Sequence, residues 1–248
     1  MKHFSSPLFT VLIIYCCFIF NGYWVIHSTF SSKNIISLSN ISIDNIWQRL
    51  LIDLILCLPI ILILNIFFIK SKEIFKINKS CLFCFCLLTF SFFVCHDYSI
   101  RGIYIFFYSI FLISLSEELL FRGYMYPTLK KVNLIFSFFL TGCLFGISHI
   151  IVPSIMYEWS LPKIIYNIIP LIGWGIYHNS ILIYLYIKSN TLFVPITFHG
   201  LTNYFSEYGY IRIVYIIRFS FLCYYLFKDI YTNRKKIIVF FTKPHDYF

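Results

Sequence analysis

Three polar motifs interrupt stretches of the chain that are otherwise apolar. They are "SLSEELLFRGYMYP" with Glu117, Glu118 and Arg122, "FGISHI" with His149, and "ITFHGLTNYF" with His199 and Asn203. An ionisable side chain inside a membrane span is costly, so it usually faces the protein interior and marks a functional site. These three motifs are therefore the candidate functional sites of the chain.

The spacing within each motif predicts which side chains share a helix face. Glu118 and Arg122 are four residues apart and can pair along one face, whereas Glu117 lies about 140° from Arg122 around the helix axis. His199 and Asn203 are also four apart and place an imidazole and an amide together. We therefore expect Glu117 to be free of the Glu118–Arg122 pair and to point toward other helices.

Together these residue types favour hydrolysis by an activated water. A carboxylate and an imidazole can hold and deprotonate a water, and two hydrogen-bond donors can stabilise the developing oxyanion. The chain has no serine or cysteine in a recognisable nucleophile motif and no His-Glu-x-x-His zinc helix. We expect neither a metal nor a cofactor. Taken singly, each motif has a plainer interpretation, as a packing histidine or as an ion pair at a helix end.

The composition predicts that membrane-spanning helices position these residues. The 248 residues are 60% hydrophobic, 22% aromatic and only 12% charged, with a mean hydropathy of +0.82. About a quarter of the residues in a soluble globular domain are charged. The sequence therefore predicts an all-α, polytopic transmembrane helix bundle, and a single integral membrane domain over residues 1–248.

About 20 mostly apolar residues are needed to cross the hydrocarbon core as a helix, and this measure predicts seven or eight spans, of which the third and seventh are short. They are residues 8–27, 46–69, 81–96, 101–121, 133–153, 164–187, 191–206 and 211–230. Thirteen Lys and Arg residues fall on one side of the membrane and five on the other, which predicts that both termini are cytosolic.

The net charge of +10 and the nine cysteines have plain interpretations. The basic residues lie in short loops between apolar segments rather than in one patch, so no nucleic-acid partner is expected. Because most cysteines fall inside apolar segments, we interpret them as buried free thiols rather than as disulfides.

The three motifs resemble those of the type II CAAX prenyl endopeptidases, the glutamate intramembrane proteases of the wider CPBP (ABI) family. That family carries Glu-Glu-x-x-x-Arg, Phe-x-x-x-His and His-x-x-x-Asn motifs in this order, which here read "EELLFR", "FGISH" and "HGLTN". The resemblance implies that Glu117 is the general base and that His149 helps to position the water. It further implies an oxyanion site at His199 and Asn203, support from Glu118 and Arg122, and a catalytic core at about residues 101–210.

The resemblance also implies an activity. The eukaryotic branch of the family removes the C-terminal tripeptide from prenylated CAAX proteins in the endoplasmic reticulum. The expected partners are therefore prenylated CAAX C-termini and membrane lipid, and the expected location is the endoplasmic reticulum. Two alternatives stay open, a CPBP-type protein with another peptide substrate and a non-enzymatic transporter or scaffold.

One feature of the predicted spans conflicts with a shared site. If helices 101–121 and 133–153 are straight, Glu117 and His149 lie about half the membrane thickness apart. Either the fifth span begins later than residue 133, with "PTLKKVNLIF" lying partly in the membrane interface, or the helices are strongly tilted around a water-filled cavity. We favour the later start, because Lys130 and Lys131 anchor that segment near the headgroups.

Overall fold

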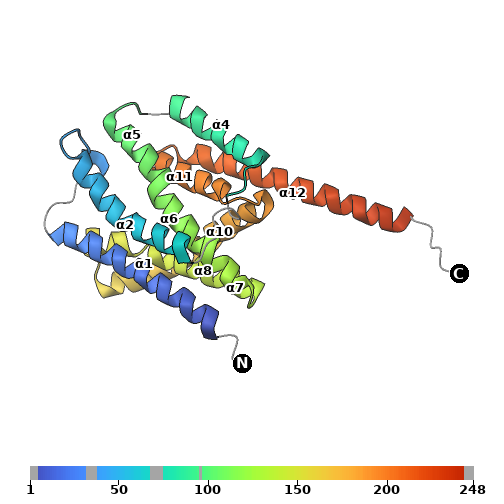
Figure 1. The fold of residues 1–248 in the computed structure, drawn as a ribbon, viewed down its shortest axis with the longest axis horizontal. Helices are drawn as coiled ribbons and strands as arrows, with labels where there is room; N and C mark the ends of the chain where they lie inside the picture. Colours follow the sequence, from blue (N-terminus) through green and yellow to red (C-terminus); the bar gives the residue numbers. More distant parts are fainter. Residues whose placement is uncertain (1–4, 32–37, 68–74, 95–96, 243–248) are drawn as a thin grey trace.

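The computed structural model describes residues 5–31, 38–67, 75–94 and 97–242, and this part of the chain contains helices and no strand. Its first helices are α1 (Ser5–Ser31), the 3₁₀ turn η1 (Leu38–Asn40), α2 (Ile46–Phe67) and α4 (Lys79–Val94). The chain continues through α8 (Leu134–Ser148), α9 (Ile151–Met156), α10 (Leu161–Ser189), α11 (Phe193–Glu207) and α12 (Ile211–Thr242). The predicted all-α polytopic bundle is confirmed (Figure 1).

Five helices of the described chain are long and apolar enough to cross a membrane. They cover Pro7–Thr29, Ile46–Ile66, Ile100–Lys130, Leu134–Met156 and Leu161–Ser189. The other three predicted spans are helical too, but α4 and α11 have only 16 and 15 residues. The third, α12, carries Arg212, Arg218 and Lys228 in its first 18 residues.

A single long helical segment, Ile100–Lys130, runs through the middle of the bundle (Figure 1). It consists of α5 (Ile100–Phe107), η2 (Tyr108–Ser114), α6 (Leu115–Glu118), η3 (Leu119–Met125) and α7 (Tyr126–Lys130). Both η2 and η3 are π-helical, and they flank the single α-helical turn that holds Glu117 and Glu118. Such wide turns are rare and are frequent at functional sites.

This segment corrects the predicted fourth span, which ended at residue 121. The helix continues through Pro127 to Lys130, and α8 starts only four residues later at Leu134. Asn133 begins α8 by accepting a hydrogen bond from the Phe136 N–H.

The corrected boundary also resolves the conflict over depth. Glu117 is 13 residues before Lys130 and His149 is 15 residues after Leu134, so at 1.5 Å per residue they lie about 20 and 22 Å from the turn. The two residues are therefore level with each other in an antiparallel hairpin. A later start for the fifth span is therefore not needed to bring the two residues together.

Glycines let α8 and α10 approach closely. A Cβ atom on Gly146 would collide with the carbonyl oxygen of Leu171, and one on Gly142 would lie 2.6 Å from the Cα of Ile176. Small residues at such positions are the usual way in which membrane helices come into contact. Gly146 therefore permits close packing of the two helices.

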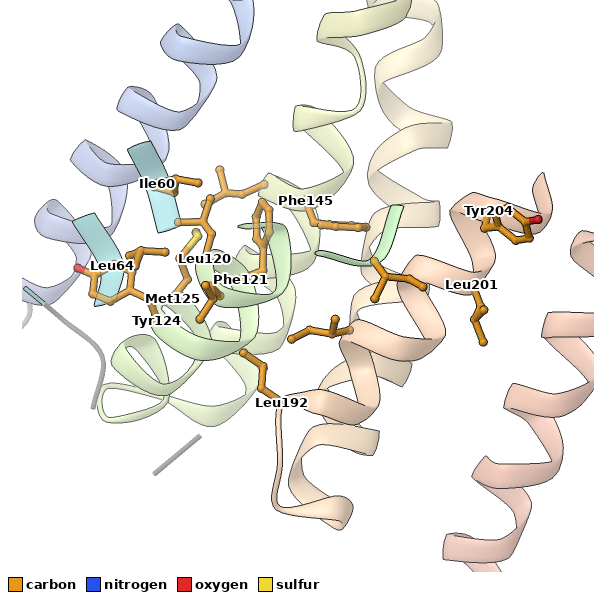
Figure 2. Packing of buried hydrophobic residues seen from close by; sticks show 14 of the residues in the cluster. Ile60, Leu64, Leu120, Phe121, Tyr124, Met125, Phe145, Leu192, Leu201 and Tyr204 are labelled. Carbon is orange, nitrogen blue, oxygen red and sulfur yellow. The ribbon is translucent and has the colours of Figure 1, made fainter. Parts of the chain in front are cut away.

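The core surrounds the long helical segment. Every residue from Leu119 to Tyr126 is buried, and Figure 2 shows Phe121 beside Phe145 of α8, with Ile60 and Leu64 of α2 near Leu120. On another side α11 packs against η2, where a Cβ atom on Gly200 would lie 2.8 Å from Ile110. This contact brings the His199 face of α11 against the helix that carries the two glutamates.

The remaining helices pack around this core. A hydrogen bond from Tyr15 to the Leu144 carbonyl links α1 to α8, and α12 packs against α10 and α11. The eight described cysteines are free thiols. Cys57 and Cys84 are buried, as expected, but Cys16, Cys17 and Cys86 are exposed, and Cys95 lies outside the described residues.

Candidate active site

Glu118 connects the first and third motifs. Its Oε1 atom accepts hydrogen bonds from Arg122 Nη1 at 2.9 Å and from His199 Nδ1 at 2.7 Å. The Glu118 and Arg122 side chains are completely buried, and His199 is buried beside them. The predicted pairing of Glu118 with Arg122 is confirmed. The contact with His199 was not predicted, and it gives Glu118 a direct part in orienting the imidazole ring.

Arg122 makes its second contact with an aromatic face. Its Cζ atom lies 4.6 Å from the centre of the Phe145 ring, within the range of a cation–π interaction. The Nε and Nη2 atoms have no hydrogen-bond partner among the described residues, so the cation is compensated by Glu118, by the Phe145 ring and, at 5.9 Å, by the Phe121 ring. Phe145, the first residue of the second motif, therefore supports the first motif.

Glu117 points to a different environment, as its position on the helix predicts. The side chain is 11% exposed, and its Oε2 atom lies 3.5 Å from Nε2 of His199, on the opposite side of the ring from Glu118. This Oε2 atom has no hydrogen-bond partner within the described part of the chain. A buried carboxylate oxygen without such a partner needs an explanation, and a catalytic role is one of the accepted ones.

Glu117 and His149 line one cavity of about 280 Å³. Its walls are mostly apolar and come from α1, α2, η2 and α9, and they include Phe18, Gly22, Leu56, Ile113 and Val152. The level arrangement of the two motifs in the hairpin therefore results in a shared, largely apolar chamber.

The local structure fixes the tautomer of His149, which is the residue that ends α8. Its Nδ1 atom lies 2.8 Å from the carbonyl oxygen of Phe145. Because a carbonyl oxygen only accepts hydrogen bonds, Nδ1 must carry the proton, and Nε2 of the neutral ring is an acceptor. The ring is held between Phe145 and Trp174, whose ring centres are 4.6 and 4.8 Å away.

Asn203 lies one helical turn beyond His199 on α11. Its amide donates a hydrogen bond to Ser114 Oγ at 3.4 Å, and Ser114 is about one turn before Glu117 on the facing helix. Five of the six predicted site residues therefore touch one another or share the cavity. Asn203 borders this group from the next turn.

Two buried polar residues near the site escaped the sequence interpretation. His178 of α10 lies with its ring centre 5.5 Å from that of His199, and its Nε2 accepts a hydrogen bond from Arg218 Nη1 at 3.2 Å. Both residues fall inside predicted spans, 164–187 and 211–230, so the rule that singled out the three motifs would have found them.

Acidic and metal-binding groups elsewhere do not form a second centre in the described chain. Buried Asp53 forms an ion pair with Arg49 of the same helix, α2, at 2.8 Å, and it accepts a hydrogen bond from Tyr104 of α5 at 2.5 Å. Within the described ranges, no three His, Cys, Asp or Glu side chains are grouped in a way that could hold a metal ion.

Comparison with known proteins identifies a family for the segment that carries all three motifs. Residues 99–205 match the sequence model of the family described as type II CAAX prenyl endopeptidase Rce1-like. No curated protein and no solved structure gives a significant match to the chain.

Proposed function

The chain belongs to the type II CAAX prenyl endopeptidases through residues 99–205, and from this membership we propose which bond it cleaves and how. The family is one of CAAX-type intramembrane proteases. The proposed reaction is removal of the C-terminal tripeptide from prenylated CAAX proteins, by a water that Glu117 activates. The observation that carries this proposal is the cavity shared by Glu117 and His149, next to a histidine that Glu118 holds in place.

The first step is activation of the water. A water between Glu117 and His149 donates one O–H to the carboxylate and the other to Nε2 of His149, the nitrogen that the Phe145 carbonyl leaves as an acceptor. With both hydrogens held, a lone pair of the water faces the scissile carbonyl. Glu117 then takes up the proton as the oxygen attacks, which is general-base catalysis.

The second step is stabilisation of the oxyanion. His199 lies between the two carboxylates, with Nδ1 2.7 Å from Glu118 Oε1 and Nε2 3.5 Å from Glu117 Oε2, so both ring nitrogens are placed to donate. Once Glu117 has taken the proton from water, it no longer attracts the Nε2–H of His199. That N–H is then available to the oxyanion, with the Asn203 amide as a second donor.

The third step breaks the C–N bond. The tetrahedral intermediate collapses, and Glu117 returns its proton to the nitrogen of the departing tripeptide. The products are a carboxylic acid on the prenylated cysteine and a free amine on the tripeptide, and transfer of the acid proton to that amine leaves a carboxylate and an ammonium group. Glu117 is ionised again at the end of the cycle.

The walls of the cavity suit a prenylated substrate. Phe18, Leu56, Ile113 and Val152 present apolar groups around the carboxylate, as a thioether-linked isoprenoid chain requires. We also propose the endoplasmic reticulum as the location, because processing of prenylated proteins by the eukaryotic branch of this family takes place there.

Cleavage by the purified protein tests the proposal. A farnesylated peptide ending in Cys-x-x-x is incubated with the protein in detergent micelles, and the products are identified by mass spectrometry. We expect a free tripeptide and a fragment ending in farnesylcysteine, and little cleavage of the same peptide without its farnesyl group. Cleavage at another bond, or equal cleavage without the lipid, would indicate another peptide substrate. No cleavage of either peptide would favour a transporter or scaffold.

A further inference from the structure

A second cavity lies between α10 and α12, on the other side of the site. Its volume is about 710 Å³, and aromatic and aliphatic side chains form most of its wall. Two buried polar side chains, His178 and Arg218, interrupt this wall. The rings are those of Trp174, Tyr177, Tyr215 and Phe219.

Arg218 is a buried cation that faces no carboxylate. It is 6% exposed, donates a hydrogen bond to His178 Nε2 at 3.2 Å, and lies 4.9 Å from the centre of the Tyr215 ring. No Asp or Glu of the described ranges pairs with it. By contrast, carboxylates pair with Arg49, Arg101 and Arg122. A buried charge without a counter-charge is strongly destabilising, so its retention at the edge of a cavity points to an anionic ligand.

One layer of rings separates this cavity from the one that holds Glu117. His178 lines the second cavity, and behind it the ring centre of His199 is 5.5 Å away. Trp174 also lines the second cavity, and its ring centre is 4.8 Å from that of His149, which lines the first cavity. The groups proposed to do the chemistry therefore lie between two chambers.

An enzyme that removes a fixed number of residues must recognise the end of its substrate. The only group that distinguishes a C-terminus from an internal peptide is its free carboxylate, which needs a cation. Three extended residues span about 10 Å. The contacts from Glu117 to His199 at 3.5 Å, between the ring centres of His199 and His178 at 5.5 Å, and from His178 to Arg218 at 3.2 Å set an upper limit of the same order on the separation of Glu117 and Arg218.

We propose that Arg218 binds the free C-terminal carboxylate of the substrate, with the last three residues in the cavity between α10 and α12. This inference rests on the proposed function, because the distance from Glu117 to Arg218 has meaning only if Glu117 is at the scissile bond. His178 holds the guanidinium in place from the side of the catalytic residues. The prenylated cysteine then lies in the first cavity and the tripeptide in the second, so the layer of rings between the cavities has to part where the peptide chain crosses it.

A binding comparison tests the proposal without changing Arg218. The probes are a fluorescent farnesylated peptide ending in Cys-x-x-x as the free acid and the same peptide as the C-terminal amide. The protein carries Glu117→Gln, so that the peptides are not consumed. We expect the amide to bind about 10- to 100-fold more weakly, since it lacks a charge-assisted hydrogen bond to the guanidinium. Equal binding of acid and amide, or binding of neither, would overturn the proposal.

Two substitutions then locate the effect. Arg218→Gln should weaken binding of the acid to the level of the amide and leave the amide unchanged, which also shows that the variant is folded. The matched control is Arg212→Gln, an exposed arginine on the same helix, which should change neither affinity. An acid preference that survives Arg218→Gln would assign the carboxylate to another residue.

The same peptides separate this proposal from the proposed function. A wild-type protein that prefers the acid but cleaves neither peptide would retain the carboxylate site and contradict the protease. A protein that cleaves the acid and the amide with equal kcat/KM would support the protease and contradict the carboxylate site.

Discussion

Replacing Glu118 with glutamine should damage both the stability of the bundle and its catalytic geometry. Glu118 Oε1 is the acceptor for Arg122 Nη1 at 2.9 Å and for His199 Nδ1 at 2.7 Å. Glutamine keeps the size of the side chain and one acceptor oxygen but removes the charge. Arg122, which is completely buried, is then left without a counter-charge. Breaking a buried ion pair from one side lowers the free energy of unfolding by about 3–5 kcal/mol.

A second substitution separates the two effects. In the variant Glu118→Gln/Arg122→Met the unpaired cation is gone, and a methionine can keep the contact with the Phe145 ring. Because replacing a whole buried ion pair by uncharged residues is often close to neutral, most of the lost stability should return. Activity should not return, since His199 still lacks its carboxylate partner. If His199 serves as an oxyanion donor, kcat stays about 10²- to 10³-fold below wild type.

Stability is measured by urea unfolding in mixed micelles, and kcat by release of the tripeptide. Asp53→Asn is the matched control, because Asp53 is also buried and also accepts from an arginine four residues away and from a second side chain. It should lose stability and keep kcat. If Glu118→Gln unfolds like wild type, the buried pair with Arg122 does not stabilise the bundle as argued. If the double variant regains activity together with stability, the proposed orientation of His199 by Glu118 is wrong.

Three further predictions follow from the same geometry. Gly146→Ala should destabilise the protein by about 1–3 kcal/mol in the urea unfolding assay, because the added methyl group collides with the Leu171 carbonyl. Gly173 has open space around it, so Gly173→Ala should be neutral or stabilising by up to about 1 kcal/mol in the same assay. His149→Phe should lower kcat by about 10²-fold or more in the cleavage assay, since the acceptor Nε2 is lost; a variant that retains wild-type kcat would contradict the water-positioning role. EDTA should leave cleavage unchanged, whereas loss that zinc restores would indicate a metalloenzyme built on Glu117, His149 and His199.

Local spacing made part of the site predictable. The pairing of Glu118 with Arg122 depends only on the four-residue separation within one helix, and the sequence carries that information directly. The role of Gly146 follows in the same way from its small size. The apolar composition alone was sufficient to predict the fold class, an all-α transmembrane helix bundle.

Other features depend on contacts between distant helices and were not predictable. Glu118 and His199 are 81 residues apart, and their hydrogen bond exists because Gly200 lets α11 approach η2. The end of the fourth span was placed too early because Pro127 and the polar motif interrupt the hydropathy pattern. The continuous helix passes through both, with two π-helical segments. His178 and Arg218 meet only through the packing of α10 against α12.

The central claim is that Glu117 activates the water, and the kinetics of Glu117→Gln test it most directly. Glutamine fills the same space but cannot accept the proton, so kcat for the farnesylated peptide should fall by about 10²- to 10⁴-fold while binding of the peptide is retained. Glu207→Gln, which changes an exposed glutamate paired with Arg101, should keep wild-type kcat. A Glu117→Gln variant with kcat within a few-fold of wild type would contradict the account.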